Sequence, residues 1–213
     1  MDTAITTIYC LIDDWLQARR HQQSKQRTVS DAEVMTTAVV AARFFGGNFL
    51  MGAELLKKQE YFGCRLSPSR FNRRLHGVAQ LLESFFEWLG QVHKACSSEQ
   101  AYLVDSCPVK VCKNIRIKRC RIYPSAATDD VFRGYNSSEK QFFYGLKVHA
   151  ITTAEGIPIE GSLTPGSYND TKHLRTFEID LPRGSLLYGD KAYNEYLTED
   201  ILADACDIEL LPQ

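Results

Sequence analysis

The chain has 213 residues, of which 44% are apolar and 24% are charged, and its formal net charge is −1. This length allows one large core or two smaller ones, and we expect two unequal parts. The composition does not fit disordered or fibrous proteins, and the near-zero net charge excludes a chain that is basic throughout.

The N-terminal segment predicts neither an exported protein nor a membrane span. It carries acidic residues ahead of its apolar ones and has no small-residue cleavage signature. We therefore expect a cytoplasmic location and no membrane partner. The seven cysteines are odd in number and irregularly spaced, which favours reduced thiols over a disulfide framework. Cys107, Cys112 and Cys120 lack the short paired spacing of a zinc site, so we interpret them as packing groups.

Residues 1–98 are predicted to be a helical domain. Apolar residues recur at helical spacing over residues 3–20, which predicts a first helix. Ser30 and Glu33 form a capping box that starts a second helix, and the pair Gly46 and Gly47 ends it. A third helix is expected over residues 53–61, and a fourth should open at Ser67 and continue to about residue 89.

Three arginines lie in the first turns of that fourth helix, away from its apolar stripe: Arg70, Arg73 and Arg74. A helix that presents arginines in this way can contact DNA as a recognition helix does. An ordinary solvated helix face carries the same residues, and the positive N-terminal end of the helix dipole disfavours arginines there. Both interpretations stay open at the level of the sequence.

Residues 99–213 change to short apolar segments separated by Gly, Pro, Asn and Asp. Strands are expected at 101–104, within FFYGLKVHAIT, within GIPIEGSLTPGS, at LLYGD and at IELLP. Helices are expected after Asn169 or Asp170 and over residues 194–205. The order β-β-β-α-β-α-β predicts an α/β fold with a ribonuclease H-like mixed sheet, preceded by the helical domain.

Two aspartates follow buried strands in the same way. Asp105 ends the apolar run of AYLVD, and Asp190 ends that of SLLYGD. Each aspartate alone could simply bond its own backbone in a turn. In open α/β sheets, however, ligands sit at the carboxyl ends of the strands, so the pair favours a shared functional site. We expect the two carboxylates to lie side by side.

A basic segment follows the first aspartate, and we define it as residues 110–121. Its cations have no acid among them: Lys110, Lys113, Arg116, Lys118, Arg119 and Arg121. We expect this segment to contact phosphates when DNA is present. Lys191 follows Asp190 and could touch a phosphate or be merely solvated. His149 and His173 have no second histidine at ligand spacing, so we interpret both as structural.

Four segments in order resemble the insertion-sequence transposases that use an Asp-Asp-Glu triad: LVDSCPVKVC, FFYGLKVHAIT, LTPGSYNDTKHL and LLYGDKAYNEY. The likeness covers roughly residues 101–213. The helical part is similar to the DNA-binding region of these proteins, mainly at LSPSRFNRRL.

This resemblance implies a site that cleaves phosphodiester bonds and transfers DNA strands. Asp105 and Asp190 take the first two positions of the triad, which in the family binds two Mg²⁺ or Mn²⁺ ions. The chemistry agrees, because hard divalent ions prefer oxygen ligands and two such ions can stabilise an in-line displacement. The implied partner is DNA, both transposon ends and target, and a homodimer on DNA is left open.

The sequence departs from the family at the third acid, which the family carries on a helix after the fifth strand. No acid near the end matches that motif: Glu195, Glu199, Asp200, Asp204, Asp207 and Glu209. We therefore expect a C-terminally truncated domain with impaired activity and with apolar surface exposed at Ile208, Leu210 and Leu211.

Two other functions stay open. A non-catalytic DNA-binding protein derived from a transposase would use the same cations for phosphate contacts alone. A phosphatase with an aspartate nucleophile would need a second acid two residues after Asp105, where Cys107 stands.

Overall fold

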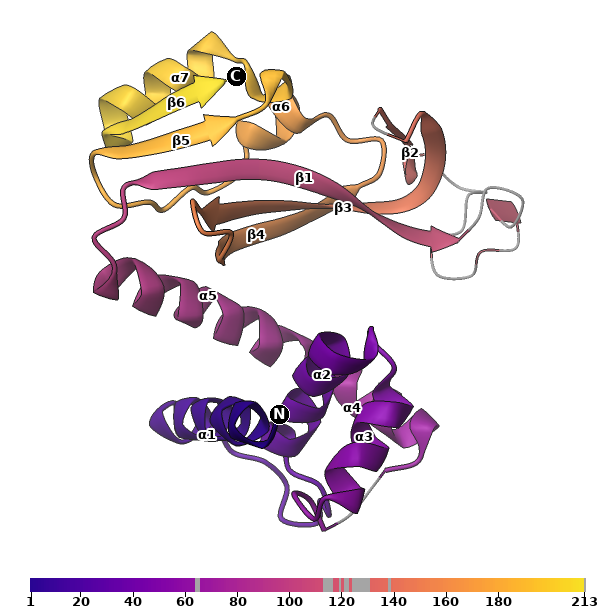
Figure 1. Ribbon diagram of the computed structural model, residues 1–213. Helices are drawn as coiled ribbons and strands as arrows, with labels where there is room; N and C mark the ends of the chain where they lie inside the picture. The colour runs from indigo at the N-terminus through magenta and orange to yellow at the C-terminus, as the bar shows by residue number, and fades with distance from the viewer. Residues whose placement is uncertain are drawn as a thin grey trace. The chain divides into compact units, whose positions relative to one another are not determined.

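The computed structural model describes residues 1–63, 66–112, 117–118, 120, 123, 131–137 and 139–212 (Figure 1). The chain divides into two compact units, Met1–Phe86 and Glu87–Gln213. The division falls inside one helix, α5 (Ala79–Cys96). The predicted domain boundary at residues 98 and 99 stays a prediction.

The first unit is helical, as its sequence pattern indicates. Ser30 and Glu33 bond each other's backbone amides in the predicted capping box at the start of the second helix. Gly46 ends that helix in the left-handed conformation, which glycine adopts without steric cost. Besides the first part of α5, the helices are α1 (Asp2–Ala18), α2 (Asp31–Phe45), α3 (Phe49–Lys58) and α4 (Pro68–Gly77).

The fourth predicted helix is in fact two helices, α4 and α5, so the prediction of one continuous helix is wrong. The break lies at Val78, whose backbone N–H donates to the carbonyls of Arg74 and Leu75. Gly77 precedes the break and is a poor helix former. The Val78 side chain at this break is buried.

The core of the first unit contains Ile5, Val40, Leu56 and Phe62. No single helix among the described residues is long and apolar enough to cross a membrane. The helices α2 and α3 pass that test only as a pair, and the pair is bent by 108° at its break.

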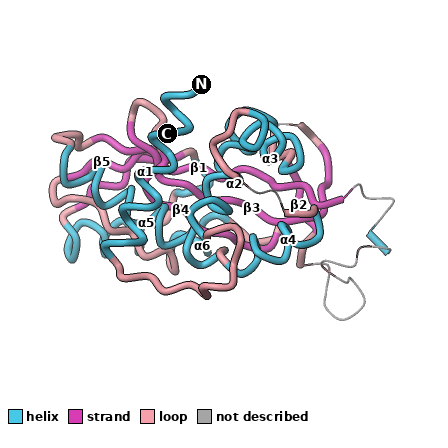
Figure 2. The backbone as a smooth tube through the Cα atoms, turned by 90° about the horizontal axis from the view of Figure 1, so that it is seen from below, coloured by secondary structure: helices cyan, strands magenta, loops and turns pink. Residues whose placement is uncertain are grey.

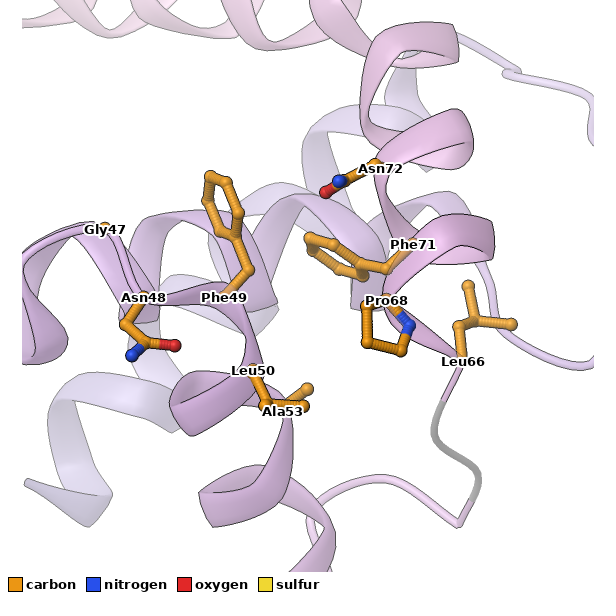
Figure 3. A pocket seen from close by; sticks show the side chains of 9 residues that line it. All are labelled: Gly47, Asn48, Phe49, Leu50, Ala53, Leu66, Pro68, Phe71 and Asn72. Atoms are coloured by element: carbon orange, nitrogen blue, oxygen red, sulfur yellow. The ribbon is translucent and has the colours of Figure 1, made fainter.

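A cavity of about 240 Å³ lies between the α2–α3 turn and the start of α4 (Figure 3). The phenyl rings of Phe49 and Phe71 lie on its wall with their centroids 5.5 Å apart. Leu50, Leu66 and Pro68 also line it, so its wall is mainly apolar.

The second unit is built on a mixed sheet of six strands in its described part (Figures 1 and 2). One edge of β3 pairs antiparallel with β1, and its other edge pairs antiparallel with β2 and β4. On the far side of β1, β5 and then β6 run parallel to it. The strands are β1 (Ala101–Cys112), β2 (Arg133–Asn136), β3 (Gln141–Thr153), β4 (Pro158–Pro165), β5 (Ser185–Gly189) and β6 (Ile208–Pro212). This confirms the predicted α/β, ribonuclease H-like architecture.

Strand β1 is longer than its apolar run predicts. It continues past Asp105 and through Pro108, which lies opposite Lys147 of β3. Its pairing with β5 ends at Val104, so beyond that residue β3 is its partner among the described strands. A strand with one partner tolerates a proline, because the missing N–H can face away from the ladder.

One face of the sheet is covered by short helices that follow β4 and β5. Leu174, Tyr193 and Leu202 from these elements pack in one buried cluster with Val104 and Leu187. The elements are α6 (Asp170–Leu174), the 3₁₀-helix η3 (Lys191–Tyr193), α7 (Tyr196–Ile201) and the π-helix η4 (Leu202–Cys206).

The opposite face is more exposed. Successive residues of a strand point to opposite faces, so Leu103 and Asp105 lie across the sheet from buried Val104. Leu103 is 42% exposed and Leu163 of β4 is 65% exposed. The expectation that Ile208 and Leu210 would be exposed is wrong, because both pack in the buried cluster with Leu202.

Candidate active site

The parallel pairing of β1 with β5 brings the two predicted aspartates together. Val104 and Gly189 are ladder partners, and Asp105 and Asp190 are the residues that follow them. Strand β5 ends at Gly189, whereas β1 continues past Asp105, so Asp105 lies within its strand at the level where β5 ends. This register brings the two residues to the same part of the sheet despite their distance in sequence. Both residues are exposed to solvent.

Each aspartate also makes the local turn contact that the simpler interpretation predicts. Asp105 Oδ1 accepts the backbone N–H of Ser106 at 2.7 Å. Asp190 is the cap of η3, and its Oδ1 accepts the backbone N–H of Ala192 at 2.9 Å. These bonds fix the direction of each carboxylate. They use one oxygen of each side chain and leave the other oxygen without a hydrogen bond to any described residue.

A third carboxylate, Asp170, contacts the residue that follows Asp105, and the sequence does not predict this contact. It is the first residue of α6, and its side chain is 18% exposed. Its Oδ1 accepts the hydroxyl of Ser106 at 3.1 Å and the Nζ of Lys147 at 3.0 Å. The sequence shows Asp170 only as a helix start; in the structure Asn169 caps α6, so Asp170 makes tertiary contacts instead.

Tyr193 lies close to all three carboxylates. Burial raises the pKa of its phenol, and the negative charge of Asp170 adds to that effect. The charges of Asp105 and Asp190 also raise this pKa, whereas Ser106 opposes the rise. The Tyr193 hydroxyl nevertheless forms no hydrogen bond of normal geometry with a described residue. The charges of three acidic side chains therefore act on this one buried phenol, and Asp170 has the largest effect among them.

Two histidines lie next to each other near Asp170, with their rings tilted by 38°. The rings of His149 and His173 lie 3.9 Å apart between centroids, and both are buried. His149 Nε2 pairs with the hydroxyl of Thr164 at 2.8 Å, while its Nδ1 lies 3.8 Å from Asp170 Oδ1. Burial lowers the pKa of His149 to about 4, and the neighbouring His173 contributes to that shift.

The donor set suits a hard divalent ion, since Asp105 and Asp190 offer carboxylate oxygens where β5 ends beside β1. Within the described residues no group of three or more His, Cys, Asp or Glu is arranged to hold a metal ion. Glu195 is engaged elsewhere, because it accepts bonds from Arg175 and Thr198. The chemistry of the pair therefore fits Mg²⁺ or Mn²⁺, with two protein ligands.

Residues 95–213 match the family described as the transposase DDE domain. The matched residues include the six described strands and both aspartates. The chain belongs to this family. No curated protein matches the chain. Membership makes the protein a transposase in general terms, and DNA and divalent metals are the general partner and cofactors of the family.

Within the transposase domain, the structure describes only part of the basic segment. Lys110 is exposed but pairs with Glu139, so this cation has an acidic partner that the segment itself does not supply. Lys118 is exposed, as is Lys191 beside Asp190. Four cations predicted to contact DNA lie outside the described residues: Lys113, Arg116, Arg119 and Arg121.

The three arginines of α4 differ in their surroundings. Arg70 and Arg73 are exposed. Arg74 instead donates to the carbonyl of Val29 at 2.8 Å and to Asp31 Oδ1 at 2.7 Å. A buried carboxylate such as Asp31 needs cationic partners, and the structure gives Arg74 this internal role. A DNA contact of Arg74 stays a prediction.

We expect the free energy of unfolding to decrease as the pH falls from about 6.5 towards 4. The unfolded chain binds a proton at His149 near pH 6.5, whereas the folded chain resists this protonation until about pH 4. The full shift corresponds to a loss on the order of 3 kcal/mol. Urea titrations at several pH values measure it.

The variant His149→Gln should flatten this pH dependence, because glutamine does not titrate. The exposed His76 provides a matched control, and His76→Gln should keep the wild-type slope. Equal slopes for wild type and His149→Gln would show that His149 is not the group responsible.

Proposed function

We propose that the chain is a DDE-type transposase of a bacterial insertion sequence in which Asp105 and Asp190 are the catalytic metal ligands. The observation that supports the proposal best is the Val104–Gly189 pairing, because Asp105 and Asp190 directly follow these partners inside the matched family region. Their exposure supports the same role, because a DNA phosphate must reach them.

The proposed chemistry is metal-assisted cleavage and transfer of phosphodiester bonds. A bound Mg²⁺ or Mn²⁺ supplies charge stabilisation to the attacking and leaving oxygens. Asp105 and Asp190 supply the oxygen ligands, each oriented by its bond to a backbone amide. The exposed Lys191 supplies a positive charge beside Asp190 that attracts a phosphate.

We further propose that the 213-residue chain binds DNA and a divalent ion but does not transfer strands. Support comes from the shortage of ligands, because no third acid joins the pair among the described residues in a metal-holding group. Two-metal phosphoryl transfer needs both ions fixed in position, and misplacing groups by about 1 Å can cost on the order of 100-fold in rate.

The same shortage favours the alternative of a DNA-binding protein derived from a transposase but without catalysis. The phosphatase alternative gains no such support, because Cys107 still stands where the second acid is required. Turnover of a small phosphomonoester by the purified chain would revive it.

We expect the wild-type chain to bind Mn²⁺, which electron paramagnetic resonance of the free Mn²⁺ measures. The variants Asp105→Asn and Asp190→Asn should each weaken this binding at least tenfold. Loss of a charged ligand removes both an oxygen donor and a negative charge. Asp204→Asn is the matched control, since Asp204 is an exposed acid on η4. On a supercoiled plasmid carrying the gene and its flanking DNA, we expect no strand transfer by any of them.

Two results would contradict this account in different ways. Mn²⁺ affinity that is the same in all four proteins would remove Asp105 and Asp190 as ligands. Robust strand transfer by the wild type, abolished by Asp105→Asn, would confirm the site but reject the inactivity, and would require a further acid as third ligand.

We expect the basic segment to carry much of the DNA affinity. Replacing Lys113, Arg116, Arg119 and Arg121 by glutamine should reduce the slope of log affinity against log salt by roughly 0.9 for each phosphate that the variant no longer neutralises. Lys110 is left unchanged because it pairs with Glu139. Fluorescence anisotropy with a labelled duplex measures the slope.

The control for this experiment replaces four exposed cations elsewhere by glutamine: Lys25, Lys57, Lys58 and Arg183. Both variants change the net charge by the same amount, so a difference between them reports location. If the two slopes are equal, the basic segment is only solvated surface.

A further inference from the structure

We propose that the first two residues of α6, Asp170 and Thr171, are positioning residues that fix the spacing between Asp105 and Asp190. The inference rests on the proposed function of those aspartates as metal ligands. Neither Asp170 nor Thr171 has to touch metal or DNA for this role, because each acts through a neighbour of one aspartate.

Asp170 holds the segment that carries Asp105. Its Oδ1 accepts the hydroxyl of Ser106 at 3.1 Å. The backbone N–H of the same serine donates to Asp105 Oδ1 at 2.7 Å. Ser106 therefore links the two carboxylates, and its side chain ties this part of β1 to α6.

Thr171 holds the segment that carries Asp190. Its hydroxyl donates to the carbonyl of Ala192 at 2.7 Å. The backbone N–H of Ala192 donates to Asp190 Oδ1 at 2.9 Å. Two adjacent residues of α6 thus reach the two aspartate segments, each through the residue whose amide orients the carboxylate.

The start of α6 is itself anchored to the sheet. Lys147 of β3 donates to Asp170 at 3.0 Å and to the carbonyl of Tyr168 at 3.1 Å. His173, two residues after Thr171, pairs through Nε2 with the hydroxyl of Ser162 of β4 at 2.6 Å. These contacts attach the start of α6 to β3 and β4, so the residues that contact the aspartate segments are themselves held in position.

We call the contacts of Asp170 with Ser106 and of Thr171 with Ala192 the α6 clamp. Its effect would be to hold the two aspartates in position before a metal ion binds. Two carboxylates at one site repel each other, and a metal ion binds them best when their positions are set in advance. Groups that orient metal ligands from outside typically change metal affinity by 10- to 100-fold when they are mutated. Asp170 adds a third negative charge to this region, and its pairing with Lys147 offsets that charge.

The test compares Thr171→Val, which removes the hydroxyl, with Thr171→Ser, which keeps it. The control is Thr176→Val, because the Thr176 hydroxyl bonds the carbonyl of His173 and neither aspartate segment. The first measurement is amide hydrogen exchange in metal-free protein by NMR. We expect Ala192 to exchange about tenfold faster in Thr171→Val, with Leu187 in the adjacent strand unchanged.

The second measurement is Mn²⁺ affinity by electron paramagnetic resonance. We expect a 10- to 100-fold loss in Thr171→Val, recovery in Thr171→Ser and a wild-type value in Thr176→Val. Ser106→Ala probes the Asp170 side of the clamp, because it removes the hydroxyl and keeps the backbone amide. It should weaken Mn²⁺ binding in the same range.

The proposal is overturned if Thr171→Val matches the wild type in both measurements, or if Leu187 exchange rises as much as that of Ala192. The latter would mean general loss of stability rather than local positioning. If wild-type chain binds no Mn²⁺ through Asp105 and Asp190, the proposed metal site fails. The exchange measurement would then still decide whether Thr171 holds the Asp190 turn.

Discussion

The site depends on one constraint, the register of the parallel pairing between β1 and β5. Tyr102 and Val104 of β1, with Leu187 of β5, point into the same buried cluster. Because side chains alternate along a strand, a shift by one residue would expose this apolar set. The hydrophobic core therefore fixes the register, and the register places Asp105 beside Asp190.

Gly189 adds a local requirement to that register. A Cβ at this position would lie 3.1 Å from the Tyr193 Cβ and 3.1 Å from a methyl carbon of Val104. These separations are tighter than ordinary van der Waals contact. The absence of a side chain lets the chain turn directly after β5, with Tyr193 packed beneath the turn. The glycine before Asp190 is thus part of how the strand end is built.

The charged side chains in this region are exposed to different degrees. Asp105 and Asp190 face solvent, whereas Asp170 is mostly buried and paired with Lys147. His149, which lies near Asp170, is held neutral near pH 7 by a lowered pKa. A neutral His149 leaves the negative charge of Asp105 and Asp190 available to a cation from solution. His149 therefore adds no positive charge to this region near pH 7.

The sequence predicts the features that depend on neighbours in the chain. The apolar runs before Asp105 and Asp190 indicate their strands, and Ser30 with Glu33 indicates a helix start. The sequence does not predict features that depend on partners far away in the chain. The contacts of Asp170 with Ser106 and Lys147 follow from the sheet register, and the contact of Arg74 with Asp31 follows from helix packing. The break at Val78, which follows Gly77, is likewise not predicted.

The most direct test of the central claim is paramagnetic broadening of backbone amide resonances by substoichiometric Mn²⁺. The amides of Ser106 in β1 and Ala192 in η3 donate to the two aspartates, so one ion held by both carboxylates should broaden both resonances first and together. The exposed acids Glu155 and Asp204 lie in other elements and should be affected only at higher Mn²⁺. Early broadening at Ser106 without Ala192, or equal broadening at Glu155 and Asp204, would contradict a shared site.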